Sequence, residues 1–245
     1  MRKILLRFLT TIVLSTLLLP VPAVLAASSI LIWPINPTLS SQERARPLWL
    51  ENQANVPATL QIRILRWQQV QQRNDYQPQD DILPSPPVVT IAPGKRQLVR
   101  LTLTGAAPTS GEQAYRILVD EIPDARQQAR EASDSRVQFR MRYSVPLFVT
   151  SSEVPEQSAH IAEALRWSVI TENGQRYLRV HNPGSAHARL ARVQMDGTTV
   201  AEGLLGYVLA GTTKQWPLPN NMNAGRSLTA TVNGADPVKL HYAGS

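Results

Sequence analysis

The side chains that could do chemistry are few in this sequence, and they lie far apart. The four histidines are His160, His181, His187 and His241, and no helical spacing brings them together. His181 and His187 flank an Asn-Pro-Gly turn and could meet across a hairpin, but a metal site needs a third ligand, which the sequence does not offer. We therefore interpret this pair as two surface histidines and expect no metal site.

Paired acids are no better as candidates for catalysis. Asp80 and Asp81 lie in a polar loop, whereas Asp120 and Glu121 lie in a predicted strand, where adjacent side chains point to opposite faces and cannot share a substrate. The sequence has no G-x-S-x-G motif and no glycine-rich phosphate loop, and without cysteine it can form no thiolate metal site or cysteine nucleophile. These absences disfavour an enzyme, so we expect no catalytic residue and no cofactor.

Part of the formal net charge of +7 comes from an N-terminal segment with the layout of an export signal. Three basic residues lie within residues 1–7, an apolar run covers 12–19, and small residues precede a cleavage point after Ala26. Two prolines interrupt the apolar segment at a length that is short for a membrane span. Removal of the signal peptide, residues 1–26, takes away three of 25 basic residues and none of 18 acidic ones, which lowers the net charge from +7 to +4.

We expect the mature chain to be a soluble protein of the bacterial periplasm. No later segment reaches membrane-spanning length, so no membrane insertion is expected after cleavage. The basic residues are dispersed among acidic ones, which argues against nucleic-acid binding. With no cysteine, the exported chain must hold its fold by packing alone.

The elements that must position any functional residue are short strands. Apolar and polar residues alternate along most of the sequence and no long stretch has helical periodicity, which predicts an all-β protein built of antiparallel sandwiches. One domain is predicted over 27–150, a polar linker over 151–160 and a second domain over 161–245. The predicted strands are 48–50, 59–67, 88–91, 98–103, 115–121 and 137–149, then 165–170, 177–180, 188–195, 206–209, 228–232 and 238–242.

A weak internal repeat supports two related sandwiches. Residues 48–60 and 178–190 can be aligned without a gap, and each segment reads as strand, turn, strand. Four positions then coincide, namely Leu48 with Leu178, Asn52 with Asn182, Ala58 with Ala188, and Leu60 with Leu190.

The longest alternating run, residues 137–149, indicates an edge strand that a partner uses. Val137, Phe139 and Met141 fall on one face of the run, and at ~3.3 Å per residue its 13 residues extend about 43 Å. Pro146 argues against a central strand, because proline cannot donate to the hydrogen-bond ladder. A long apolar edge promotes aggregation unless a partner covers it, and strand addition by a bound chain is one such use.

Together with the sequence around it, this strand resembles a known family. The chain is similar to periplasmic chaperones of the chaperone–usher pilus pathway, and most similar to the archaic branch that assembles Csu-type pili. The segments that carry the resemblance are 32–35, 48–52, 61–67, 82–87, 115–123 and 141–148, with a looser match at 206–209.

The resemblance implies an all-β fold of two immunoglobulin-like β-sandwiches set at an angle. It also implies donor-strand complementation, in which Val137, Phe139 and Met141 enter the open groove of a pilus subunit that lacks one strand. Burial of these three side chains would supply ~5–9 kcal/mol before ordering costs. The capped subunit would then pass to an outer-membrane usher, and no cofactor is implied.

The two basic residues that bind the subunit in the best-known members of this family are missing from their usual positions in this sequence. In the best-known members an arginine on the first strand and a lysine on the donor strand anchor the C-terminal carboxylate of the subunit, but Asn36 and Met141 align there in this sequence. We expect Arg116 to replace this anchor, with Arg142 as second choice, because a guanidinium can hold a carboxylate through two parallel hydrogen bonds. The alternative for each arginine, a solvent-facing position on a strand, is weaker for Arg116 than for Arg142.

Two other classes of protein remain as alternatives. A pilus or surface-adhesin subunit would carry an N-terminal donor extension of alternating apolar residues, but residues 27–29 lead almost directly into the first strand, which the resemblance places at 32–35. A glycan-active β-sandwich enzyme would present two facing carboxylates in a cleft.

Overall fold

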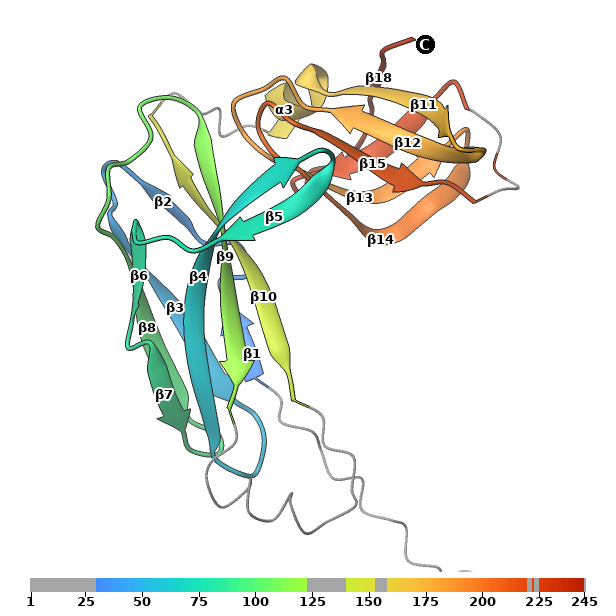
Figure 1. Ribbon diagram of the computed structural model, residues 1–245. Helices are drawn as coiled ribbons and strands as arrows, with labels where there is room; N and C mark the ends of the chain where they lie inside the picture. The colour runs from blue at the N-terminus through green and yellow to red at the C-terminus, as the bar shows by residue number, and fades with distance from the viewer. Residues whose placement is uncertain (1–29, 123–139, 153–157, 220–221, 223–224, 245) are drawn as a thin grey trace, which may run out of the picture.

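The computed structural model describes residues 30–122, 140–152, 158–219, 222 and 225–244. The predicted signal peptide, residues 1–26, and the predicted donor residues Val137 and Phe139 lie outside these ranges. The described chain is almost entirely β-structure, and it forms two sandwiches (Figure 1). The second sandwich lies across one end of the first, so the two are set at an angle, as the resemblance implied.

The first sandwich has two sheets, and the chain crosses from one to the other between its first two strands. One sheet has the order β1 (Ile30–Trp33), β3 (Ala45–Asn52), β8 (Arg96–Leu103) and β6 (Ile82–Ser85). The other has the order β2 (Thr38–Ser40), β10 (Arg142–Thr150), β9 (Glu112–Glu121), β4 (Ala58–Val70) and β5 (Arg73–Gln77), and β7 (Val88–Ile91) also pairs with β4.

The second sandwich follows a short helix, α3 (Ser158–Ala164). One of its sheets has the order β15 (Thr213–Pro217), β12 (Gln175–His181), β11 (Arg166–Glu172) and β18 (His241–Tyr242). The other has the order β14 (Thr198–Val208), β13 (Ala188–Met195), β16 (Leu228–Val232) and β17 (Pro237–Lys239).

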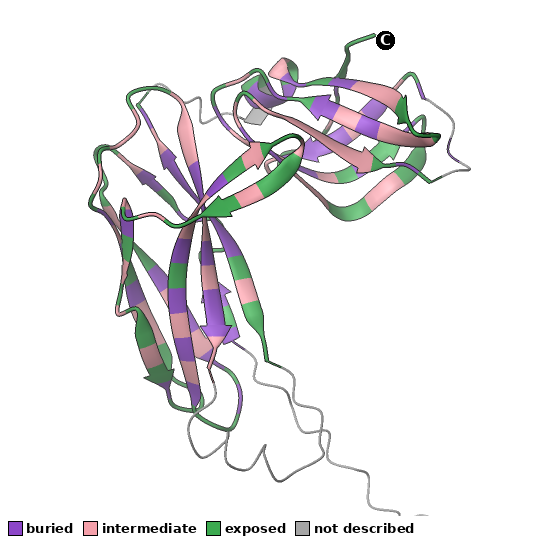
Figure 2. Cartoon of the chain, viewed as in Figure 1, coloured by how far each residue is buried: buried purple, intermediate pink, exposed green. Residues whose placement is uncertain are grey.

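Each sandwich has its own apolar core. Buried residues alternate with exposed ones along the strands, and the buried ones lie between the two sheets of each sandwich (Figure 2). A third, smaller cluster joins the two sandwiches, with Trp67, Ala114 and Phe148 from the first sandwich packed against Leu209 and Tyr207 from the second. This junction cluster sets how the residues of the two sandwiches face each other.

The internal repeat corresponds to a shared structural device. All eight matching residues are buried, and the two asparagines make the same set of hydrogen bonds. The Asn52 amide donates to the carbonyls of Val56 and Ile91 and accepts a bond from the Ala54 amide. The Asn182 side chain makes the equivalent bonds to Ala186, Val208 and Gly184. Each asparagine therefore ties a turn to a neighbouring strand in its own sandwich.

The predicted strands occur in the structure with different ends, but strands β1, β2, β6 and β15 were not predicted and β14 begins eight residues before the strand predicted over 206–209. Of the strand predicted over 137–149, the structure has the part from Arg142 onward, in β10. Arg140 and Met141 are exposed and lie outside any strand, and residues 137–139 are not described. The predicted linker, 151–160, contains the start of α3, whose seven residues are too few to give a helical period. The polar strand β5 was not predicted, since it has no apolar alternation.

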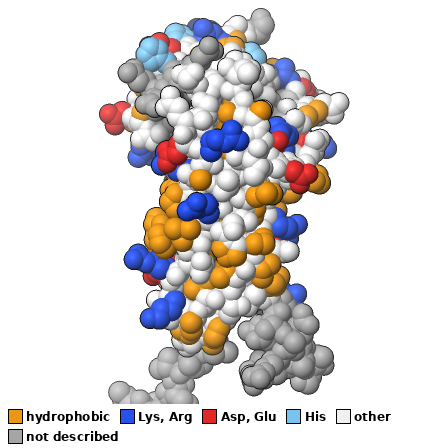
Figure 3. Space-filling view, turned by 90° about the vertical axis from the view of Figure 1, so that its left-hand side faces the viewer, with side chains coloured by type: hydrophobic (Ala, Val, Ile, Leu, Met, Phe, Trp, Pro, Cys, Tyr) orange, Lys and Arg blue, Asp and Glu red, His pale blue; other side chains and the backbone are white. Residues whose placement is uncertain are grey.

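Exposed apolar side chains are not confined to one place on the first sandwich. The face in Figure 3 shows them together with lysine and arginine side chains along its length. Leu31 on β1, Leu83 on β6 and Val88 on β7 are each close to half exposed. On β1 and β3, Trp33 and Trp49 stack on each other with ring centroids 6.1 Å apart.

Candidate functional site: an open strand edge and a basic cleft

The edge of β10 is open over most of the strand. Along its whole length β10 pairs with β9, but on its other side it pairs with β2 only at Phe148–Thr150. Within the described residues, no strand pairs with that side of residues 142–147. The edge position predicted from Pro146 is therefore confirmed for this part of β10. Such an edge presents unpaired backbone N–H and C=O groups to a partner.

The two faces of β10 contact different parts of the molecule. Val145, Leu147 and Val149 are buried in the core of the first sandwich. The alternate residues Ser144 and Pro146 face the space between the two sandwiches, where they line a cavity of about 290 Å³. The open edge of β10 therefore lies beside the cleft between the two sandwiches.

That cavity is walled by both sandwiches. From the first sandwich come Trp67 on β4 and Arg116 on β9, and from the second come Tyr207 on β14 and Lys214 on β15. The full lining is Trp67, Asn74, Arg116, Ser144, Pro146, Leu204, Leu205, Gly206, Tyr207, Lys214 and Trp216. It contains two cations and no carboxylate, which favours an anionic group as its occupant.

Arg116 is held between aromatic rings. Its guanidinium carbon lies 3.9 Å from the centroid of the Trp67 ring and 5.2 Å from that of Tyr207. Its Nε is buried, and among the described residues it has no hydrogen-bond partner. Burial lowers the pKa of Arg116, although an arginine stays charged at any physiological pH. The guanidinium is thus a fixed cation with donor capacity to spare.

Lys214 is the second cation of the cavity. Its Nζ donates a hydrogen bond of 2.6 Å to the main-chain carbonyl of Gln72, at the tip of the β4–β5 hairpin. Burial lowers the pKa of Lys214. Sequence reasoning missed this residue, since a single lysine on a polar strand of the second sandwich carries no signal until the two sandwiches are placed together.

The structure does not bring Arg142 to the same cleft. Arg142 lies opposite Asp120 in the β9–β10 ladder, whereas Arg116 lies opposite Pro146, four residues further along. At ~3.3 Å per residue these positions are about 13 Å apart. The guanidinium of Arg142 forms an ion pair with Asp120, which also accepts a 2.6 Å bond from Arg63 on β4.

Asp120 is therefore a junction between three strands. Its side chain is only 12% exposed. Burial acts to raise the pKa of Asp120, but the hydrogen bonds from Arg142 and Arg63 outweigh it and hold that pKa below its usual value. This ion pair fixes the beginning of β10 against β9 and β4.

The predicted donor residue Met141 lies directly before β10. Its side chain is 40% exposed, and its carbonyl accepts a bond from the Glu121 amide. The two other predicted donor residues, Val137 and Phe139, lie outside the described residues. The contact of all three with a subunit stays a prediction.

The interpretation of the histidine pair as two surface residues is wrong for His187. Its ring stacks on Phe148 with centroids 3.6 Å apart, and its Nδ1 lies 2.9 Å from both carboxylate oxygens of Glu112. His187 belongs to the second sandwich and the other two residues to the first, so this packing depends on contacts that local sequence does not reveal. His181 is exposed and hydrogen-bonds to Thr213.

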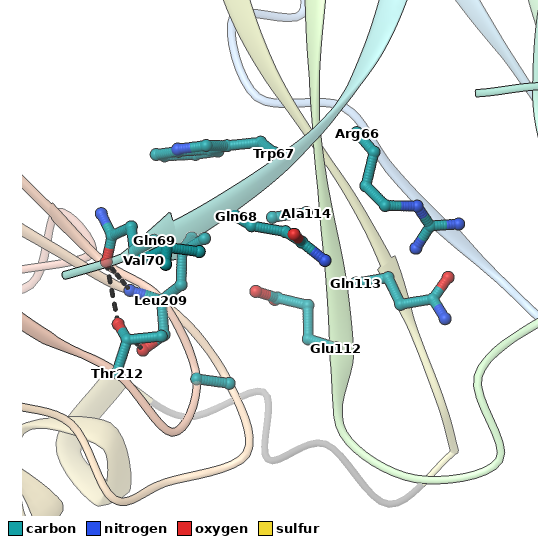
Figure 4. A pocket seen from close by; sticks show the side chains of 11 residues that line it. Arg66, Trp67, Gln68, Gln69, Val70, Glu112, Gln113, Ala114, Leu209 and Thr212 are labelled. Atoms are coloured by element: carbon teal, nitrogen blue, oxygen red, sulfur yellow. Dashed lines mark hydrogen bonds between the residues drawn. The ribbon is translucent and has the colours of Figure 1, made fainter. Parts of the chain in front are cut away.

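Gln69 also connects the first sandwich to the second beside the cleft. The Gln69 side chain donates to the Tyr207 carbonyl at 2.8 Å and accepts bonds from the Leu209 amide and the Thr212 hydroxyl, the latter two drawn in Figure 4. These bonds hold the segment that leads from β14 to β15, and thus place Lys214 relative to Arg116.

Among the described residues, no helix has the length and apolar character needed to cross a membrane.

Comparisons with known proteins agree on one family. The family model described as pili and flagellar-assembly chaperone, PapD N-terminal domain, matches residues 36–155. The "Uncharacterized fimbrial chaperone YhcA" of Escherichia coli K12 is 24% identical over 161 residues, which cover 66% of this chain. The match spans 62% of that relative's length.

Solved structures extend the likeness to both sandwiches. A chain of the CsuC–CsuE chaperone–tip adhesion subunit pre-assembly complex, from the archaic Csu pili of Acinetobacter baumannii, is 30% identical with a TM-score of 0.72, over 88% of this chain and 100% of that one. A chain of the Salmonella enterica complex of SafA pilin with the SafB chaperone shares the fold at 18% identity, with a TM-score of 0.67 over 88% of this chain and 97% of that one.

These matches do not favour the alternative of a pilus or adhesin subunit. The family model covers β10 and the part of the cleft wall that comes from the first sandwich. The chain therefore belongs to the family of pilus-assembly chaperones, and it resembles the archaic, Csu-type branch of that family.

Proposed function

We propose that this chain is a periplasmic chaperone that folds and caps pilus subunits by strand addition and delivers them to an outer-membrane usher. The observation that carries the proposal is the unpaired edge of β10 over residues 142–147, which leads into the basic cleft. A subunit strand added there gains main-chain hydrogen bonds along the edge. Pilus subunits are supported as partners by the likeness to a chain of a chaperone–subunit complex, and the usher follows from the family alone.

Export to the periplasm is part of the same proposal. The N-terminal segment 1–26 has the layout of a signal peptide, and the protein family assembles surface fibres. The subunits would meet the chaperone in that compartment after their own export.

The donor side chains would come from the segment that leads into β10. Val137, Phe139 and Met141 continue the alternation of Tyr143 and Val145, which face the core side of the first sandwich. The same alternation would carry these side chains along the groove of the subunit.

Arg116 would anchor the C-terminal carboxylate of the subunit. It lies opposite Pro146 on the open strand, and its buried Nε has unused donor capacity. A hydrogen bond to a charged group contributes ~1.5–3 kcal/mol, so Arg116→Leu should weaken subunit binding about ten- to hundredfold. Arg142→Leu is the matched control, because Arg142 pairs with Asp120 away from the cleft. Equal losses in the two variants would refute the assignment to Arg116.

Co-expression with a pilus subunit tests the whole proposal. The chain and a candidate subunit encoded beside it are produced together, and the periplasm is purified through a tag on the subunit. A stable one-to-one complex is expected, and Phe139→Asp should abolish it because a charge would enter an apolar groove. Leu83→Asp, which places the same charge at an exposed position on β6, should leave the complex intact. A complex that survives Phe139→Asp would contradict the donor role.

A further inference from the structure

The wall that the second sandwich gives to the cleft beside β10 is mostly apolar. Leu204 and Leu205 on β14 and Trp216 on β15 line it, and the Leu204 side chain is 55% exposed. We propose that these three side chains form a specificity pocket, which selects subunits by an apolar side chain close to the end of the strand that they add to β10. This inference rests on the proposed function, since it names the part of the subunit that the cleft distinguishes.

The first argument is a bulge that brings neighbouring residues to one surface. In the pairing of β13 with β14, both described in full, Leu190 lies opposite Gly206 and Ala191 opposite Leu204, so Leu205 is left without a partner residue. Neighbouring side chains of a regular strand point to opposite faces, whereas an extra residue changes the direction of those beside it. The bulge therefore accounts for Leu204 and Leu205 lining the same cavity.

The second argument is the position of Trp216 against a glycine. A methyl group on Gly206 would lie 3.0 Å from Cζ2 of Trp216, inside the ~3.5–4.0 Å at which carbon atoms pack best. Gly206 also has a φ of +155°, which residues with a side chain rarely adopt. Glycine at this position thus lets the Trp216 ring approach the backbone of β14, and both residues line the cavity.

The third argument is continuity with the open edge of β10. Ser144 and Pro146 of β10 line the same cavity as the apolar wall. A strand that adds to the edge over residues 142–147 extends this sheet, so its alternate side chains point to the same side as Ser144 and Pro146. The cavity measures about 290 Å³, just below the ~300–1,000 Å³ of pockets for small ligands, which suits one or two side chains of a bound chain.

The position of the pocket indicates which part of the subunit fills it. Arg116, the proposed carboxylate anchor, lines the same cavity, so a chain that ends there passes the pocket with its last residues. At ~3.3 Å per residue, three residues span about 10 Å, so the side chain belongs to one of the last three positions. An apolar side chain is favoured because its contact with Leu204 removes both from water.

Competition between two forms of one subunit tests the pocket. A candidate subunit encoded beside the chain is produced in its natural form and with asparagine in place of each apolar residue among its last three. Each changed form is co-expressed with the natural form and the tagged chain, and mass spectrometry of the purified complex gives the ratio of the two. The chain is wild type, Leu204→Ser or Leu204→Met, and Leu83→Ser is the matched control at an exposed leucine of β6.

With the wild-type chain, the natural form should exceed the asparagine form at least tenfold at one position. Leu204→Ser should reduce that preference several-fold, whereas Leu204→Met and Leu83→Ser should retain it. A folding defect in a chain variant lowers the capture of both forms alike and leaves their ratio unchanged.

Two kinds of failure can be told apart. A captured subunit without an apolar residue among its last three overturns the pocket, as does a preference that is absent from the wild-type chain or equal in Leu204→Ser and Leu83→Ser. In each of these results a complex still forms, so the proposed function stands. If the wild-type chain captures no subunit, the proposed function itself is wrong and the pocket falls with it.

Discussion

At the scale of single residues, the cleft depends on a cation held between rings from both sandwiches. Trp67 comes from the first sandwich and Tyr207 from the second, and Arg116 lies over both. A planar guanidinium stacked in this way has few orientations left, so its donors are pre-arranged for a planar carboxylate. A lysine at this position would keep the charge but lose the stacking and the fork of donors.

Asp120 makes the stability of the first sandwich depend on pH. Its pKa is lowered in the folded chain, so its ionised form favours folding above the ordinary value of 3.8, and this contribution is lost as the pH falls through the lower folded pKa. Allowing for solvent at the two exposed arginines, we expect about 1–2 kcal/mol. Denaturant unfolding of wild type and Asp120→Asn should differ by this amount at pH 7. The difference should begin to shrink as the pH falls below 3.8 and should disappear once the pH is below the lower folded pKa, and a constant difference would contradict the ion-pair role.

At the scale of strands and turns, the repeated asparagine predicts matched effects in the two sandwiches. Asn52 and Asn182 each make three bonds to backbone groups, two of them fully buried. Replacement by alanine leaves those groups unpaired, so each variant should lose ~1–3 kcal/mol of unfolding free energy in its own sandwich. Hydrogen exchange resolved by segment would locate the loss. A variant that destabilises the other sandwich equally would show that the two do not unfold as separate units.

Local pattern accounts for many of the strands but not for their junction. The predictions for β7 and β16 coincide with the structure, because each is a short run rich in β-branched residues between turns. The polar strand β5 and the helix α3 carry no periodic apolar signal. Pro146 correctly indicated an edge, since proline's missing donor is a local property. The position of Lys214 in the cleft and the stacking of His187 on Phe148 depend on how the two sandwiches pack against each other. That packing involves residues far apart in the sequence, so a local pattern does not predict it.

At the scale of the whole molecule, Gln69 should control how firmly the two sandwiches are held. Its three bonds to the second sandwich are each worth ~0.5–1.5 kcal/mol. Gln69→Ala should broaden the distribution of shapes in small-angle X-ray scattering and weaken subunit binding, with little change in the unfolding of either sandwich. Gln68→Ala is the control, because Gln68 is exposed on the same strand. Identical scattering for the two variants would show that the bonds of Gln69 do not control the junction.

The central claim is that a pilus subunit adds a strand to the open edge of β10. Hydrogen exchange of the chain, free and in the complex purified from periplasm, tests it directly. We expect the amides of residues 142–147 that do not bond to β9 to exchange rapidly in the free chain and to become strongly protected in the complex. The exposed edge strand β17 should exchange at the same rate in both. A stable complex in which residues 142–147 exchange as fast as in the free chain would contradict the account.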